Sequence, residues 1–222
     1  MESLTLSQKI YLLGIHPKKG GIISPAYTAM DYCILGALFL ELYQLKKIKI
    51  INKRIVLIDG KTDNELYRFI LEKIGRSEKS RRISHWVNKF YFSLKYIRSV
   101  TQHQLAQKKI IVMEQKRFLF FTWNTPYIYD KQFVTKLLTE VEKQILQNPS
   151  SETEIFLLSF VKPAGLMRRI FPEREKRRQA GKRLTRLMNT NPVSIAVADS
   201  IAVAKAVTQS ISTVSASHNS VT

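Results

Sequence analysis

The chain has 222 residues, of which 45% are hydrophobic and 24% are charged. This is the composition of a folded globular protein and excludes a disordered one. Lys and Arg number 36 against 17 Asp and Glu, so the formal net charge is +19. Such an excess predicts an anionic partner, which could be nucleic acid, an acidic membrane surface or an acidic protein.

The expected organisation is one domain over residues 1–215 followed by a polar tail at 216–222. The single cysteine, Cys33, lies in an apolar run and is interpreted as a small buried hydrophobe in a reducing compartment. The N-terminal residues do not have the pattern of a signal peptide, and no uncharged apolar window reaches about 18 residues. We therefore expect a cytoplasmic protein whose contact with a membrane is peripheral.

The first third of the chain predicts two helices and a hairpin. A capped helix ends at Gly14 and is followed by a turn at Gly20-Gly21. Residues 32–45 are apolar on all sides, which predicts a helix in the middle of the domain. The one acid in that run, Glu41, is expected to pair with a basic residue. Short β-rich runs on either side of Asn52-Lys53 predict a hairpin.

The middle of the chain alternates amphipathic and extended patterns. Residues 61–74 predict a helix, 75–82 a polar break, and 83–107 a long amphipathic segment that is either one helix or two with a bend. Residues 110–123 predict a hairpin whose tip is the charged run 114–117, with a loop after it.

The last part of the chain predicts helices. These cover residues 131–147, 154–160, a strongly basic 172–188, and an Ala/Val-rich stretch that ends near residue 212. The predicted fold is therefore mainly α, with amphipathic helices packed around a central apolar helix and peripheral β-hairpins.

Motifs that carry catalysis are not evident in the sequence. It contains no GxxxxGK[ST] phosphate loop and no GxSxG nucleophile elbow. The four histidines are far apart in the chain and lack metal-ligand spacing. We expect no catalytic residues, no metal and no cofactor, and hence a protein that is not an enzyme.

Basic residues gather in two blocks, each with nine Lys or Arg against two Glu. One block spans 68–98 and the other spans 168–186. An anionic bilayer and a nucleic acid would both use such charges. The sequence therefore leaves a lipid-binding protein and a nucleic-acid-binding helical protein as alternatives.

The predicted hairpin adds an apolar surface to this charge. Both faces of the run Phe118-Leu119-Phe120-Phe121 are apolar, so one face is left over after the core takes the other. That face suits a bilayer interface, with Lys116 and Arg117 reaching headgroups. It equally suits a homo-oligomer contact through residues 110–121, or a cover formed by the protein's own helices.

Several stretches, in their order and spacing, resemble the Golgi phosphoprotein 3 family. These are "LTLSQKIYLLGI" followed by "GGIIS", then "ILGALFLELYQLKKIKI", "LKYIRSVTQHQLAQKKIIVMEQKRFLFFTWNTPY" and "NPVSIAVADSIAVAKAV". The resemblance covers most of residues 3–212. It implies a mainly α domain that binds phosphatidylinositol 4-phosphate at the membrane surface, and it allows an adaptor for the cytosolic tails of membrane proteins.

The resemblance also implies where the headgroup pocket lies. The family's pair of arginines, one turn apart, falls on Lys95 and Arg98. The family's early aromatic falls near Ala26, with Tyr27 as a stand-in, and its central-helix arginine falls on Leu35. These departures suggest a bacterial member that binds anionic headgroups more loosely. Two further headgroup candidates, from the first basic block, are Arg81 and Arg82.

Overall fold

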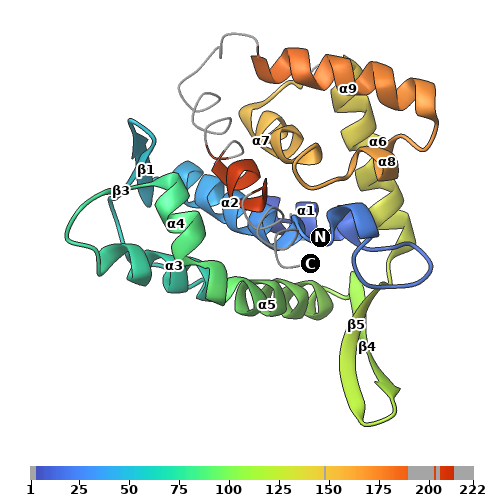
Figure 1. Ribbon diagram of the computed structural model, residues 1–222, viewed down its shortest axis with the longest axis horizontal. Coiled ribbons are helices and arrows are strands. Elements are labelled where there is room, and N and C mark those ends of the chain that lie inside the picture. The colour runs from blue at the N-terminus through green and yellow to red at the C-terminus, as the bar shows by residue number, and fades with distance from the viewer. Residues whose placement is uncertain (1–3, 148, 190–202, 204–205, 213–222) are drawn as a thin grey trace, which may run out of the picture.

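Helices make up most of the fold, and one of them, α2 (Met30–Gln44), runs through its centre (Figure 1). The computed structural model describes residues 4–147, 149–189, 203 and 206–212. The other labelled α-helices are α1 (Leu6–Gly14), α3 (Glu65–Gly75), α4 (Ile83–Lys89), α5 (Leu94–Gln107), α6 (Lys131–Gln147), α7 (Glu152–Val161), α8 (Met167–Ile170) and α9 (Arg174–Asn189).

The central position of α2 follows from its composition. Its residues are apolar on every side, so the helix must be covered all round, and α1, α4, α5 and α7 pack against it. Gly36 permits a close contact with α7, because a Cβ there would lie 2.8 Å from the Phe160 ring. The prediction of a central helix is confirmed, with a start two residues earlier than the predicted Tyr32.

Helix α1 begins with a capping box. The Thr5 hydroxyl accepts a hydrogen bond from the Gln8 amide at 3.4 Å, and the Gln8 side chain accepts one from the Thr5 amide at 3.3 Å. Ser7, which lies within this capped first turn, donates its backbone N–H to the buried carboxylate of Glu41 at 2.5 Å. The expected basic partner of Glu41 was therefore wrong: a backbone amide fills that place. Burial raises the pKa of Glu41, and the bond from Ser7 opposes that shift.

A small antiparallel sheet lies beside this helical core. Its strands, in spatial order, are β1 (Ile48–Ile51), β2 (Arg54–Leu57) and β3 (Arg81–Arg82). The β1–β2 turn places Asn52 and Lys53 at φ 51° and 59°, as a tight hairpin requires, so the predicted hairpin is confirmed. The segment 75–82, predicted only as a polar break, ends in β3, which pairs with β2.

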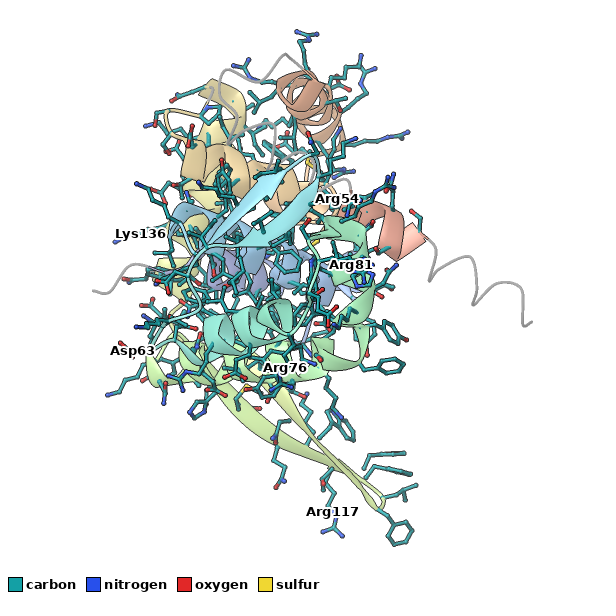
Figure 2. All side chains as sticks on the ribbon, turned by 90° about the vertical axis from the view of Figure 1, so that its left-hand side faces the viewer. Arg54, Asp63, Arg76, Arg81, Arg117 and Lys136 are labelled. Carbon is teal, nitrogen blue, oxygen red and sulfur yellow. The ribbon has the colours of Figure 1, made fainter. Side chains whose placement is uncertain are left out.

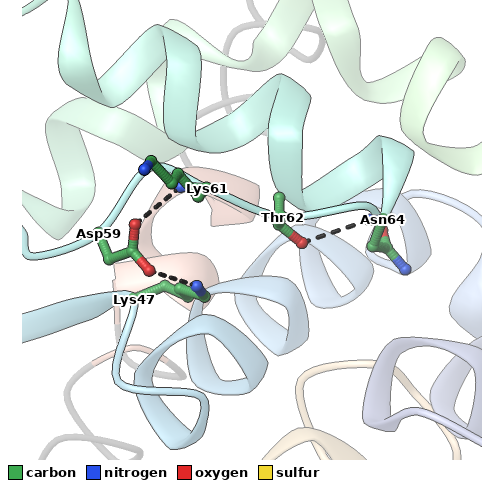
Figure 3. A network of polar contacts seen from close by, with 5 residues as sticks. All are labelled: Lys47, Asp59, Lys61, Thr62 and Asn64. Carbon is green, nitrogen blue, oxygen red and sulfur yellow. Dashed lines mark hydrogen bonds and ion pairs between the residues drawn. The ribbon is translucent and has the colours of Figure 1, made fainter.

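The loop from the sheet to α3 is held by a polar network (Figure 3). Asp59 accepts from the Lys47 ammonium at 2.5 Å and from the Lys61 amide at 2.9 Å. The hydrogen bond from Lys47 is the main cause of the lowered pKa of Asp59. Thr62 then accepts from the Asn64 amide at 3.3 Å, and the Asn64 side chain caps α3. These bonds explain where the predicted helix of 61–74 begins.

A second hairpin projects from the body (Figure 1). It consists of β4 (Ile111–Phe118) and β5 (Phe121–Ile128), and the pair Phe118–Phe121 closes it, which leaves Leu119-Phe120 as the turn. The predicted charged tip at 114–117 was wrong, because those residues lie within β4. The predicted loop after residue 123 was also wrong, since Asn124 to Ile128 continue β5. The strands stay paired down to the buried residues Ile111 and Ile128 at the base of the hairpin.

The remaining predictions of helices are confirmed, with small shifts at the ends. The segment 83–107 forms two helices, α4 and α5, with the 3₁₀ turn Tyr91–Ser93 between them. Helix α6 has the predicted bounds, and α9 begins two residues after Pro172. Residues 206–212 are helical, as predicted for the Ala/Val-rich stretch, whereas the tail 216–222 lies outside the described residues. Of the helices that the structure describes, none combines the length and apolar character needed to cross a bilayer.

Candidate functional site

A pocket of about 900 Å³ opens where α5 meets the base of the projecting hairpin. Helix α5 contributes Lys95, Arg98 and Gln102 to its wall, and β4 contributes Lys116 from the other side. The remaining walls come from α1, the loop that follows α1, and β5. The pocket therefore collects side chains from segments more than a hundred residues apart in the chain.

Three cations converge on this pocket. The i, i+3 spacing of Lys95 and Arg98 on α5 turns both side chains to one face, and Lys116 approaches from the hairpin. Lys116 also lies over the Tyr127 ring, with its ammonium 5.1 Å from the ring centroid. A cation–π contact of this kind holds the ammonium in place without neutralising it. The arrangement is suited to a phosphate, whose oxygens accept charge-assisted hydrogen bonds.

One carboxylate also reaches into this cationic group. Asp31, in the first turn of α2, forms an ion pair with Arg98, with Oδ2 and Nη1 3.2 Å apart. The Asp31 side chain is only 18% exposed, and its Oδ1 has no hydrogen-bond partner within the described part of the chain. Burial raises the pKa of Asp31 to about 6, although Arg98 opposes that shift. An anion that binds Arg98 must therefore compete with Asp31.

The floor of the pocket is polar. Gln102 donates a hydrogen bond from Nε2 to the Tyr11 hydroxyl at 2.6 Å, and burial raises the pKa of Tyr11 to about 12. The hydroxyl consequently keeps its own proton and adds no negative charge beneath the cations. Tyr11 lies in the apolar segment of α1, and no pattern in the sequence distinguishes it from a core residue.

The loop after α1 closes one side of the pocket. It is tied back on itself by a bridge between Ile15 and Ile22, and Gly21 donates its N–H to the Pro126 carbonyl at 2.8 Å. Gly20, at φ 68°, lies so close to the Tyr127 ring that a Cβ would be 2.7 Å from it. The predicted Gly20-Gly21 turn thus fixes the loop against β5.

Three of the five predicted headgroup residues, Tyr27, Lys95 and Arg98, line this pocket, and two do not. Lys116, which was predicted as part of the hairpin, joins them there. Arg81 and Arg82 are exposed on β3, beside β2, and do not line the pocket, as the position of Arg81 in Figure 2 illustrates.

Two positions that were expected to differ from the pattern of the resembled family lie away from the pocket. Leu35 and Ala26 are both fully buried in the core. Neither side chain lines the pocket, whereas Tyr27, next to Ala26, does so and is 69% exposed. Of these three residues, only Tyr27 can therefore contact a molecule bound in the pocket.

The hairpin tip is an exposed apolar surface. Phe118, Leu119, Phe120 and Phe121 are 66%, 67%, 93% and 72% exposed. Of the three alternatives left open for this run, burial by the protein's own helices is excluded within the described residues. Arg117 stands at the same end of the hairpin (Figure 2) and donates to the Leu119 carbonyl at 3.3 Å, which supports the turn.

No metal-binding group is found in the part of the chain that the structure describes, since no three His, Cys, Asp or Glu side chains converge there. Cys33 is completely buried, and burial raises its thiol pKa.

A comparison with protein families gives one match that spans nearly the whole chain. The model of the family described as Golgi phosphoprotein 3 (GPP34) matches residues 6–204, a range that includes α2, α5, both hairpins and every residue of the pocket.

Proposed function

Because the chain belongs to the Golgi phosphoprotein 3 family, we propose that it is a peripheral membrane protein that binds anionic lipid headgroups. The ligand class is a phosphomonoester headgroup of the phosphatidylinositol 4-phosphate type, read from the cytoplasmic side. The proposed function is binding and includes no catalytic step. One observation carries it: the pocket with Lys95, Arg98 and Lys116 lies at the base of a hairpin whose apolar tip is exposed.

Each pocket residue would make a different kind of contact with the headgroup. Arg98 presents a planar guanidinium that can hold two phosphate oxygens, whereas Lys95 and Lys116 act as point charges. The buried Tyr11 hydroxyl accepts a hydrogen bond from Gln102 and so fixes that side chain in the pocket wall. A pocket with one arginine and two lysines recognises the charge of a phosphate more than its exact position. We therefore expect it to bind several kinds of phosphorylated headgroup.

The hairpin supplies the second part of membrane binding. Phe118 to Phe121 would enter the interfacial region, where aromatic and aliphatic side chains are favoured, while Arg117 stays at the level of the headgroups. Each cation near an anionic surface contributes about 1 kcal/mol. Stable anchoring of peripheral proteins generally needs two such signals together, one apolar and one electrostatic.

Vesicle sedimentation tests the proposal. The full chain should sediment with phosphatidylcholine vesicles that contain phosphatidylinositol 4-phosphate, and much less with phosphatidylcholine alone. Combined Lys95→Glu and Arg98→Glu substitutions should abolish this binding. Lys136→Glu reverses the charge of another exposed lysine, on α6, and is the control, which should bind nearly as the parent does (Figure 2). Wild-type failure to bind any anionic vesicle at moderate salt would refute the proposal.

Headgroup selectivity needs a separate measurement. Vesicles with phosphatidylserine at equal total charge distinguish a phosphomonoester pocket from a general basic surface, because only the former discriminates between them. Soluble inositol phosphate should displace the protein from the phosphoinositide vesicles. Equal binding to both vesicle types, without displacement, would mean that the pocket is not used.

A second candidate function, nucleic-acid binding, is favoured by the basic block of 168–186. Most of its side chains are exposed on α8 and α9, at the opposite end of the molecule from the hairpin tip (Figure 1). Steep salt-dependent binding to DNA or RNA that survives the Lys95→Glu and Arg98→Glu substitutions would favour it. A third alternative is an adaptor for the cytosolic tails of membrane proteins. Binding of the protein to immobilised tail peptides in the absence of lipid would distinguish it from the lipid-binding and nucleic-acid-binding functions.

A further inference from the structure

The junction between α4 and α5 carries two aromatic residues on the surface. Tyr91 and Phe92 form the 3₁₀ turn together with Ser93, and their rings make an edge contact with centroids 5.1 Å apart. Phe92 is 93% exposed, equal to Phe120 at the hairpin tip, and Tyr91 is 46% exposed. A connecting turn usually carries polar residues, so an apolar pair at this position requires an explanation.

Helical geometry places this pair in line with the pocket. Tyr91 precedes Lys95 and Arg98 by four and seven residues, which is the spacing of one helical face, and its 3₁₀ turn leads directly into α5. The stripe of α5 that lines the pocket therefore continues, one turn toward the N-terminus, to Tyr91, with Phe92 next to it. On its other side Tyr91 lies near Tyr32 of α2, and together with burial it raises the pKa of that phenol. Tyr32 in turn follows Asp31, the partner of Arg98.

The hairpin lies at the opposite end of the same helix. Helix α5 has 14 residues and is therefore about 20 Å long, and β4 begins four residues after it ends. In Figure 1, α5 runs along the lower edge of the body and the hairpin extends beyond that edge. The cationic pocket thus lies between Tyr91-Phe92, at the N-terminal end of α5, and the hairpin that begins beyond its C-terminal end.

We infer that Tyr91-Phe92 is a second membrane-contacting element, which inserts beside the headgroup pocket and holds α5 parallel to an anionic bilayer. The inference rests on the proposed lipid-binding function and adds the orientation of the bound protein. The bilayer fits as the occupant because the aromatic pair is continuous with the pocket and is followed by the exposed Lys95, which suits an anionic interface. A contact at one end only would leave the protein free to tilt about the hairpin.

Environment-sensitive labelling tests this inference. Single cysteines introduced by Phe92→Cys, Phe120→Cys and Leu146→Cys can each carry an NBD fluorophore, because the native Cys33 is buried and inert. Leu146 is a partly exposed apolar residue at the end of α6, far from the hairpin tip (Figure 1). On vesicles of phosphatidylcholine with phosphatidylinositol 4-phosphate, the emission at positions 92 and 120 should shift to the blue, and that at 146 should not.

The outcomes separate the two levels of the proposal. A shift at 120 without one at 92 overturns the second anchor and leaves lipid binding intact, as it would if the aromatic pair docked a protein instead. No shift at either position, together with no sedimentation, refutes lipid binding itself.

Unlabelled variants provide an independent measurement. Phe92→Ser should weaken vesicle partitioning about tenfold, Phe92→Trp should retain it, and Leu146→Ser should leave it unchanged. Phe92 has few contacts to lose, so its replacement should not disturb the fold. If the Phe92→Ser variant partitioned onto vesicles as strongly as the wild type, the inference would be overturned.

Discussion

Arg98 on α5 and Asp31 on α2 form an ion pair of 3.2 Å at the edge of the candidate headgroup pocket. The pair gives one of the pocket's cations an internal competitor for any phosphate. Since burial raises the pKa of Asp31 to about 6, this competitor loses its charge at mildly acidic pH. Anion binding at this site should therefore depend on the protonation of Asp31.

The first prediction concerns the pH dependence of binding. At pH 7.5, where Asp31 is ionised, Asp31→Asn should bind phosphoinositide vesicles about three- to tenfold more tightly than the wild type. At pH 5 both proteins have a neutral group at position 31, and the difference should disappear. Using the ratio of the two affinities cancels the titration of the phosphate itself. A ratio that does not change between pH 5 and 7.5 would contradict the competition.

The same substitution should affect stability with a related pH dependence. A carboxyl whose pKa rises from 3.8 to about 6 on folding stabilises the native state only where it is protonated. Its contribution is complete below pH 3.8 and is lost as the pH rises through 6. Asp31→Asn should therefore raise the free energy of unfolding by about 2–3 kcal/mol at pH 7.5 and by little at pH 4, as measured by urea denaturation.

The hairpin tip should contribute to membrane binding but not to folding. Phe120→Glu places a charge where the side chain is 93% exposed, so the thermal midpoint should not change. Vesicle binding should fall more than tenfold, because a carboxylate is expelled from the interface and repelled by anionic lipid.

Size-exclusion chromatography of the same variant separates a membrane anchor from a subunit contact. An elution volume equal to that of the wild type, together with lost vesicle binding, is the result expected for a membrane anchor. A shift from oligomer to monomer would instead assign the tip to a homo-oligomer interface.

Glu41 should matter as a hydrogen-bond acceptor and not as a charge. Its carboxylate accepts the Ser7 amide, and burial raises its pKa. Glu41→Gln keeps an acceptor for that amide, so its stability at pH 7 should be equal to or greater than that of the wild type. Glu41→Ala leaves the amide without an acceptor and opens a cavity, which should cost about 2–4 kcal/mol in urea unfolding. Equal losses in the two variants would show that the charge itself is needed.

Gly165 links the core to the pocket. It has φ 67°, and a Cβ there would lie 2.2 Å from the carbonyl oxygen of Pro25, two residues before Tyr27. Gly165→Ala should destabilise the fold by about 2 kcal/mol or more and weaken vesicle binding, because the segment that carries Tyr27 must shift. Gly60→Ala is the matched control, since a Cβ there meets nothing within 4 Å. Normal binding by a folded Gly165→Ala protein would remove Tyr27 from the site.

The parts of the site that depend on one helix could be predicted from the sequence. The spacing of Lys95 and Arg98 puts both on one face of α5 whatever surrounds that helix. The uniformly apolar α2 must be central for a similar reason, since no face of it tolerates water. Both properties depend only on the residues of a single segment.

The hairpin shows where reading from the sequence failed. Charged residues usually occupy turns, so the run 114–117 was expected at the tip, and the apolar residues were assigned to a strand. The pairing of β4 and β5 is decided by the whole ladder, from the pair Ile111–Ile128 to the pair Phe118–Phe121, and it places Leu119 at φ 52° in the turn. An apolar tip violates the residue preferences of turns, and local propensity therefore could not predict it.

The sequence by itself therefore determined the helical architecture, the excess of cations and the pair on α5, because each of these is a local or summed property of the chain. Only the tertiary structure decided which distant groups share the pocket. Lys116, on β4, lies across the pocket from that pair, and Asp31 reaches Arg98 from the start of α2. These contacts join residues separated by 18 to 67 positions in the chain, and such distances are set by packing around the core rather than by any pattern along the sequence.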